Sequence, residues 1–270
     1  MAFMRALLLA AALAAPAPTP YAAAVHVARE IGPRPAASAG ELRAQRYAER
    51  QFRAAGLRIG WERFAVPGRG QSRTLIAVRD TPARCLTVLM AHTDSGPGLP
   101  AANDNASGVG VLVALAARLP AAPRCDVWLA VTGAEERWVT GTPDHLGASA
   151  LVRRLKRLGR SGDVRLGLSL DEVGRGRRFY LVSPVPRPRR SVEHVVLRAA
   201  RAEGAPARWQ RDAATGNSDH RELALAGMPA AKLGPWRNAE PCRHRPCDDW
   251  RRLDRRTLNL ALAIALRVVR

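Results

Sequence analysis

The sequence predicts a single-domain α/β fold in which a central mixed, mostly parallel sheet is flanked by helices. Three apolar runs typical of buried strands, at 85–90, 127–131 and 164–170, alternate with helical patterns at 107–119 and 147–158. The 270-residue length is enough for one large domain with a substantial core. Neither an internal repeat nor a clear linker divides the sequence, so we expect one folded unit.

Six segments have the apolar spacing of helices. They span 21–31, 41–55, 107–119, 147–158, 191–203 and 251–269. Gly32-Pro33-Arg34-Pro35 interrupts the first pattern, and Gly56 suits the end of the second. The third segment is dominated by Gly, Val, Leu and Ala and is expected to be buried. The fourth carries Arg on its outer face, and the sixth is amphipathic.

Seven segments are expected to be strands. They span 57–66, 74–78, 85–90, 127–131, 164–170, 178–182 and 229–233. Pro67-Gly68-Arg69-Gly70 is typical of a turn between the first two. Polar or irregular segments at 183–190, 212–219 and 235–249 are expected to connect the later elements.

The amino-terminal residues have the three-part pattern of a secretory signal peptide. A short positive start, Met1–Arg5, precedes an apolar run at 6–15 and a Pro/Ala-rich exit at 16–24. We assign 1–24 to a signal peptide with an approximate cleavage site, and 25–270 to the folded domain. The alternative is an apolar helix packed on the core. No stretch reaches the ~20 apolar residues of a membrane span, so we expect a secreted or periplasmic protein.

The four cysteines are compatible with export. An even count in an exported chain predicts two disulfides. Cys242 and Cys247 lie close together around His244, which makes their bridge the better supported one. A Cys85–Cys125 bridge requires the two apolar runs that they open to be neighbouring strands. Four reduced thiols are the alternative; without a Cys-x-x-Cys pair, a cysteine-rich metal site is disfavoured.

The chain is strongly basic, with a net charge of +20 and a pI near 11.5. Lysine occurs only at Lys156 and Lys232, so the positive charge is nearly all arginine. The arginines are scattered and not gathered in a block with interleaved aromatics, as a nucleic-acid interface would require. We therefore attribute the charge to source composition and a solvated surface, and expect no nucleic-acid partner.

Acidic residues and a histidine follow the three apolar runs. These residues are His92, Asp94, Asp104, Glu135, Glu136 and Asp171. In open α/β sheets, ligands bind outside the carboxyl ends of the strands. Carboxylates crowded there would repel each other, and one or two divalent cations would resolve the repulsion.

The residue types favour zinc as the metal. Imidazole together with carboxylate is a zinc ligand set, and catalytic zinc sites keep a position for water. Two ions would need a bridging carboxylate, and the attacking water needs a base that is not itself a ligand. The adjacent Glu135 and Glu136 suit this division, one as ligand and the other as base.

Several motifs together resemble those of the M28 zinc peptidases, in particular the secreted bacterial aminopeptidases. They are AHTDS, ANDNASG, GAEE, SLDEVG and CRHRPCDD, with IGPRP near the amino end and SDHREL and AGMPA near the carboxyl end. The resemblance extends from about Ile31 to the end of the chain. It implies the zinc-peptidase (phosphorylase/hydrolase-like) fold for this domain.

The resemblance also assigns roles to the motif residues. It makes His92 and Asp171 ligands of one zinc, Glu136 and His244 ligands of the other, Asp104 the bridge, Glu135 the general base, and Asp94 the acid that orients the His92 ring. It further implies a cis peptide bond between Asp104 and Asn105.

Two features depart from the family pattern. Arg243 stands where many secreted members have a tyrosine that stabilises the tetrahedral intermediate, a task that a cation can also perform. The segment RWVTGT, at 137–142, replaces the usual residues after the Glu pair, near the expected substrate pocket. His220 is interpreted as supporting the substrate site and not as a ligand. His26 is expected at the surface; His145 and His194 are expected to be helix or loop residues.

The resemblance implies a zinc exopeptidase that hydrolyses the amino-terminal peptide bond with a metal-bridging water. It would use two zinc ions, act as a monomer and bind peptides with a free amino terminus. One alternative is a glutaminyl-cyclase-like aminoacyltransferase with a single zinc; the complete His92 and Asp171 pair favours two ions. Another is a non-catalytic basic binding module, which an intact Glu135 and full ligand set disfavour.

Overall fold

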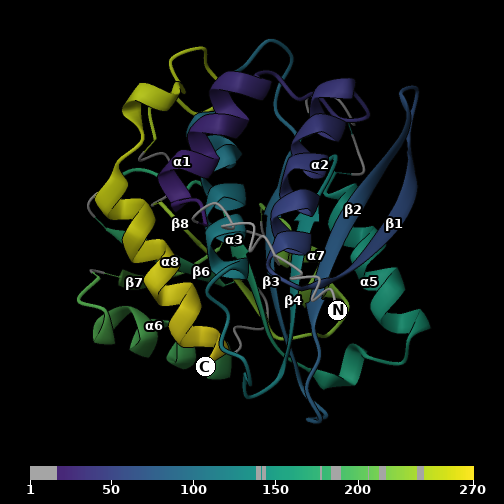
Figure 1. Cartoon of the computed structure of the whole chain (residues 1–270), viewed down its shortest axis with the longest axis vertical. Helices are drawn as coiled ribbons and strands as arrows, with labels where there is room; N and C mark the ends of the chain where they lie inside the picture. Colours follow the sequence, from purple (N-terminus) through teal and green to yellow (C-terminus); the bar gives the residue numbers. More distant parts are fainter. Residues whose placement is uncertain are drawn as a thin grey trace, which may run out of the picture.

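A computed structural model of the protein describes residues 17–137, 141, 144–176, 178–183, 190–205, 207–212, 217–235 and 240–270. These residues form one α/β domain around an eight-stranded sheet with the strand order β1-β2-β4-β3-β5-β8-β6-β7 (Figure 1). Residues 1–16 of the expected leader and most of the RWVTGT segment lie outside the described residues.

The predicted mixed, mostly parallel sheet is confirmed. Its strands are β1 Arg58–Val66, β2 Gly70–Arg79, β3 Leu86–His92, β4 Asp126–Thr132, β5 Val164–Leu170, β6 Phe179–Ser183, β7 Ala207–Arg211 and β8 Ala230–Gly234. The central strands β4, β3, β5 and β8 run parallel. The hairpin β1–β2 adds an antiparallel edge, and β6 pairs antiparallel with β8 and parallel with β7. Strand β7 was not predicted, because its sequence ARWQR is polar and half exposed.

The six predicted helices occur close to their predicted positions. The helices of the structure are α1 Pro20–Val25, η1 His26–Ile31, α2 Ala39–Ala54, η2 Ala102–Ala106, α3 Ser107–Ala116, α5 Leu146–Arg157, η3 Ser161–Asp163, α6 Arg190–Ala202, α7 His220–Leu225, η4 Trp250–Arg252 and α8 Arg255–Val269. The short helices α7, η2, η3 and η4 were not predicted. The last helix begins later than predicted, because Asp254 caps it by accepting a hydrogen bond from the Thr257 backbone N–H. No described helix is long and apolar enough to cross a membrane.

The two faces of the sheet carry different helices. Helices α1, α2, α3, α6 and α8 cover one face, and α5 and α7 cover the other (Figure 1). Side chains alternate along each strand, so Leu89 and Leu129 face the first group while Met90 and Trp128 face the second. Both faces are therefore buried, which explains the continuous apolar runs in the sequence.

Helix α1 begins inside the segment assigned to the signal peptide. Its Ala23 and Ala24 are fully buried against α3. The contact is close because Gly110 of α3 has no side chain; a Cβ there would lie 2.5 Å from the Pro20 carbonyl oxygen. Residues from Pro20 onward thus belong to the core of this structure.

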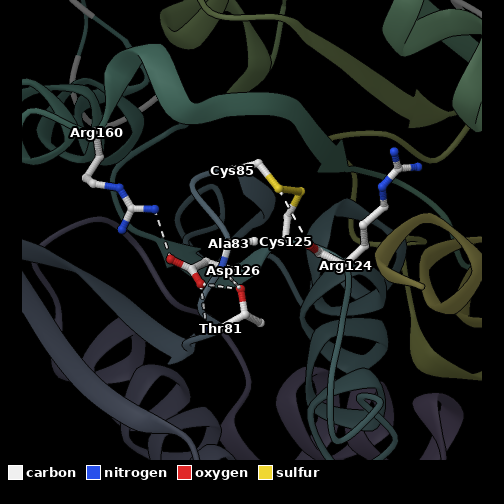
Figure 2. The surroundings of a disulfide bond; sticks show 7 residues. All are labelled: Thr81, Ala83, Cys85, Arg124, Cys125, Asp126 and Arg160. Carbon is white, nitrogen blue, oxygen red and sulfur yellow. Dashed lines mark hydrogen bonds and ion pairs between the residues drawn. A yellow bond between two sulfur atoms is a disulfide. The ribbon is translucent and has the colours of Figure 1, made fainter.

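Both predicted disulfides are present. Cys85 directly precedes β3 and Cys125 directly precedes β4, and their bridge joins these parallel neighbours (Figure 2). Cys242–Cys247 closes a short loop around His244. Beside the first bridge, Asp126 accepts hydrogen bonds from the backbone N–H and hydroxyl of Thr81 and pairs with Arg160 (Figure 2).

Candidate metal centre

The carboxyl ends of three parallel strands bring the predicted site residues together. Strand β3 ends at His92, β4 leads through Gly133 and Ala134 to the Glu pair, and β5 is followed directly by Asp171. Because β3 lies between β4 and β5, these ends meet at one edge of the sheet. The sequence pattern therefore corresponds to one location in space.

One cluster forms around the His92 ring. Its Nε2 lies 3.2 Å from Asp104 Oδ1, 3.6 Å from Asp171 Oδ1 and 4.0 Å from Glu135 Oε2. All four side chains are at least nine-tenths buried. The ligand atoms of His92, Glu135 and Asp171 lie within 4.8 Å of one another, as do those of His92, Asp104 and Glu136, so each group could hold a cation.

A second cluster adjoins the first through Asp104. His244 Nε2 lies 3.2 Å from Asp104 Oδ2 and 3.2 Å from Glu136 Oε1. The two oxygens of Asp104 thus face two different imidazoles, as a bridging carboxylate requires. All five predicted ligands are brought together.

The electrostatics of the centre suit a divalent cation. Burial raises the pKa of Glu136 to about 8, and the Asp104 charge adds to this shift. Burial lowers the pKa of His244, but Asp104 and Glu136 raise it further, to about 10. The Asp171 Oδ1 atom is buried without a hydrogen-bond partner among the described residues. A zinc ion would satisfy a buried carboxylate oxygen that has no hydrogen-bond partner and faces an imidazole nitrogen.

The loop that carries Asp104 is fixed from outside the sheet. Asp248 accepts hydrogen bonds from the backbone N–H groups of Asn103 and Asp104, at 2.8 and 2.9 Å. The Asp104–Asn105 peptide is cis, as predicted. The Asn105 amide donates to the Leu170 carbonyl, which ties the loop to the end of β5.

The Arg34 side chain holds the adjoining loop, and this explains the IGPRP motif. Its fully buried guanidinium donates to the carbonyls of Thr93 at 2.7 Å, Gly32 at 2.7 Å, Pro100 at 2.9 Å and Ala101 at 3.0 Å. Burial lowers its pKa to about 10, which leaves the group charged at neutral pH. Arg34 thereby fixes the chain between His92 and Asp104.

Asp94 lies next to the His92 ring and also orders the Glu pair. Its carboxylate accepts the backbone N–H of Glu135 at 3.0 Å and of Glu136 at 2.8 Å. The same carboxylate is 3.6 Å from His92 Nδ1, while the Asp94 carbonyl oxygen is nearer, at 3.2 Å. Asp94 therefore links the end of β3 to the loop after β4.

Comparison with known proteins decides the family. The sequence profile described as Peptidase family M28 matches residues 75–269. The chain belongs to peptidase family M28. No match was found among curated protein sequences.

Solved structures share the M28 fold at low sequence identity. BSAP, a zinc aminopeptidase from Bacillus subtilis, has 16% identity and a TM-score of 0.78, with 93% of each chain covered. A leucine aminopeptidase precursor from Bacteroides thetaiotaomicron has 20% identity and a TM-score of 0.81, covering 94% of this chain and 98% of that one. The glutaminyl cyclase of the same organism has 20% identity and a TM-score of 0.82, covering 93% and 96%. The fold is thus shared with both enzyme classes.

His145 is a site residue of this M28 domain that sequence reasoning did not identify. It is buried, with Nε2 3.3 Å from Glu135 Oε1 and Nδ1 3.4 Å from Glu222 Oε1. Ser149 donates to the other Glu222 oxygen at 3.1 Å. The one available signal was its position at the start of the helix that follows the Glu pair.

Two positively charged side chains, Lys232 and Arg243, lie beside the candidate metal centre. Lys232 Nζ is 3.0 Å from Asp171 Oδ2, and the ammonium is buried. Arg243 makes a two-pronged pair with Glu172, whose Oε1 lies 2.9 Å from Arg243 Nε. Burial lowers the pKa of Arg243, but the Glu172 carboxylate raises it more, so the guanidinium stays charged. Sequence reasoning had singled out Arg243 but not the placement of Lys232.

His220 is not brought to the cleft. It lies fully buried on α7, with Nε2 3.5 Å from Asp212 Oδ2. Its neighbour Asp219 approaches the centre instead and accepts a hydrogen bond from the Thr132 hydroxyl at 2.6 Å. Burial and the Glu135 charge raise the pKa of Asp219 to about 7.

The centre opens into a cleft of about 290 Å³. Its described lining consists of His92, Asp104, Glu135, Glu136, Arg137, Asp144, His145, Asp171, Glu172, Asn217, Lys232, Arg243 and His244. The cleft is thus formed almost entirely by charged and ionisable side chains.

Proposed function

We propose that this M28 protein is a zinc-dependent aminopeptidase that removes the amino-terminal residue of peptides. One observation carries the proposal: two imidazole–carboxylate clusters share Asp104, and the carboxylate of Glu135 lies beside them. This arrangement supplies ligands for two ions and a separate base.

Zinc is the metal that the donor set suits. His92 and Asp171 would hold one ion, Glu136 and His244 the other, and Asp104 would contact both. Bound zinc would polarise the scissile carbonyl and lower the pKa of the attacking water. A peptide with a free amino terminus would enter the cleft, where carboxylates can accept hydrogen bonds from its ammonium group.

Glu135 is the proposed general base. It would take a proton from the attacking water and return it to the leaving amine nitrogen. The 3.3 Å contact with His145 Nε2 supports this role, because it fixes one Glu135 oxygen while the other faces the metal ligands. His145 acts as a positioning residue that Glu222 holds in turn.

Arg243 is the proposed substitute for the family tyrosine. Its pairing with Glu172 keeps the guanidinium at the cleft wall, and Arg243 directly precedes His244 in the Cys242–Cys247 loop. There it would stabilise the negative charge that develops on the carbonyl oxygen.

The test is a Glu135→Gln variant assayed on aminoacyl and dipeptide substrates. Zinc content should equal that of the wild type, and kcat should fall about 10²–10⁴-fold, as expected for the loss of a general base. Glu30→Gln, at an exposed position, is the matched control. A Glu135→Gln protein with wild-type rates would remove the base assignment. Chelation should abolish activity, and added zinc should restore it.

The same assay separates the competing functions. An aminopeptidase releases a free amino acid, whereas a glutaminyl cyclase forms a pyroglutamyl product from an amino-terminal glutamine. Pyroglutamyl product alone would establish the cyclase. A metal-loaded protein without either product would favour a binding module.

Export is part of the proposal. The two disulfides support an oxidising compartment. The burial of Ala23 and Ala24 in the core supports cleavage ahead of Thr19, which caps α1. Amino-terminal sequencing of the exported protein tests this position.

A further inference from the structure

Lys232 is a buried ammonium inside a proposed metal centre. It extends from β8, which pairs with β5, and is 3% exposed. Its Nζ lies 3.0 Å from Asp171 Oδ2 and 4.0 Å from Glu172 Oε2. An ammonium excluded from water needs such carboxylate partners, so the contact is a fixed part of the site.

The Lys232 ammonium occupies one of the two carboxylate oxygens of Asp171, a proposed zinc ligand. With Oδ2 engaged by Lys232, Asp171 offers only Oδ1 toward His92, at 3.6 Å from the ring nitrogen. That oxygen has no hydrogen-bond partner among the described residues. Asp171 is thereby preset to bind a metal through a single oxygen.

The charge of Lys232 also opposes a cation at the same carboxylate. Repulsion between like charges is strong in a buried site, where water does not screen it. A metal ion bound between His92 and Asp171 would therefore be repelled directly by the Lys232 ammonium. The position formed by Glu136 and His244 lies on the other side of Asp104.

We propose that Lys232 makes the two metal positions unequal, so that the position of His92 and Asp171 fills last and binds its ion more weakly. This inference rests on the proposed two-metal centre and goes beyond it by assigning the order of loading. At low zinc, the protein would then hold one ion, between Glu136 and His244, with Lys232 as the cation beside Asp171.

The experiment is a metal titration of the purified full protein after chelation, followed by calorimetry with Zn²⁺ and by the visible absorption of Co²⁺. Because of the repulsion from Lys232, the wild type should bind its second ion about tenfold more weakly than the first. Lys232→Met removes the like-charge repulsion, so it should tighten the second step about tenfold and leave the first within about twofold.

The chain contains a matched control for this variant. Lys156 is the only other lysine and is exposed on α5, so Lys156→Met should leave both steps unchanged. Lys232→Arg keeps a cation at the site and should keep the steps unequal. If Lys232→Met fails to fold, Lys232→Gln serves as the neutral variant.

Each result has a distinct meaning. The inference would be overturned if the wild type bound both zinc ions with equal affinity. It would also be overturned if a neutral variant at position 232 kept the wild-type difference between the two affinities. Either result would leave the proposed function intact. A wild-type protein that binds no zinc would instead refute the proposed function. Unequal steps that become equal only when position 232 loses its charge would establish the role of Lys232.

Discussion

Loss of the Cys85–Cys125 disulfide should lower the unfolding free energy more than loss of Cys242–Cys247. Zinc affinity, in contrast, should fall more after loss of Cys242–Cys247. Cys242–Cys247 spans a sequence separation of 5 and encloses His244, whose backbone φ is 56°. Cys85–Cys125 spans a separation of 40 at the amino ends of β3 and β4. The perturbation is replacement of each pair by serine, one pair at a time.

The magnitudes follow from loop length and position. The entropy of the unfolded chain predicts a loss of about 2 kcal/mol of unfolding free energy for the short loop and about 4 kcal/mol for the long one. Zinc affinity should depend more on the short loop than on the long one. Opening the short loop frees a proposed ligand and should weaken binding about 10–100-fold. Strand β3 runs from Leu86, next to Cys85, to His92, so at ~3.3 Å per residue the Cys85–Cys125 bridge lies roughly 20 Å from the centre.

The assay combines two measurements on non-reduced proteins. Guanidinium unfolding of the metal-free proteins gives the stability change, and competition with a chromophoric chelator gives the zinc affinity. If loss of Cys85–Cys125 weakens zinc binding as much as loss of Cys242–Cys247, the local role assigned to the short loop is wrong. Wild-type zinc affinity after loss of Cys242–Cys247 would refute it as well.

Further variants test the groups that hold the centre. Arg34→Met should lower the unfolding free energy by at least about 3 kcal/mol, because several buried carbonyls lose their hydrogen-bond donor. The exposed Arg43→Met variant is the control. A loss below about 1 kcal/mol for Arg34→Met would contradict the reasoning. His145→Gln should lower kcat about tenfold with KM and zinc content unchanged, whereas an altered KM alone would argue against positioning of Glu135. Burial lowers the pKa of His145, but Glu135 and Glu222 raise it further, from 6.5 to about 10. Its stabilisation is therefore complete below pH 6.5 and disappears as the pH rises through about 10. In unfolding experiments, the stability difference between wild type and His145→Gln should shrink over that range, and a constant difference would refute the ion pair.

Much of the fold follows from local patterns in the sequence. Apolar runs, Gly and Pro positions and helical spacing locate the central strands and long helices to within a few residues. Prediction failed where the local pattern is weak. The edge strand β7, with the sequence ARWQR, is polar, and the six-residue helix α7 is too short for a clear periodicity.

The sequence by itself predicted the proposed metal ligands, because they follow strand ends or lie in ordered family motifs. His92, Asp104 and Asp171 could be assigned in this way before their distances were known. Only the tertiary structure decided the partners of these groups. Lys232 lies 61 positions from Asp171, and Arg34 holds carbonyls from a distant loop. Such buried polar contacts depend on which strands and loops become neighbours, and a lone Lys, His or Arg has no periodicity that would reveal its partner.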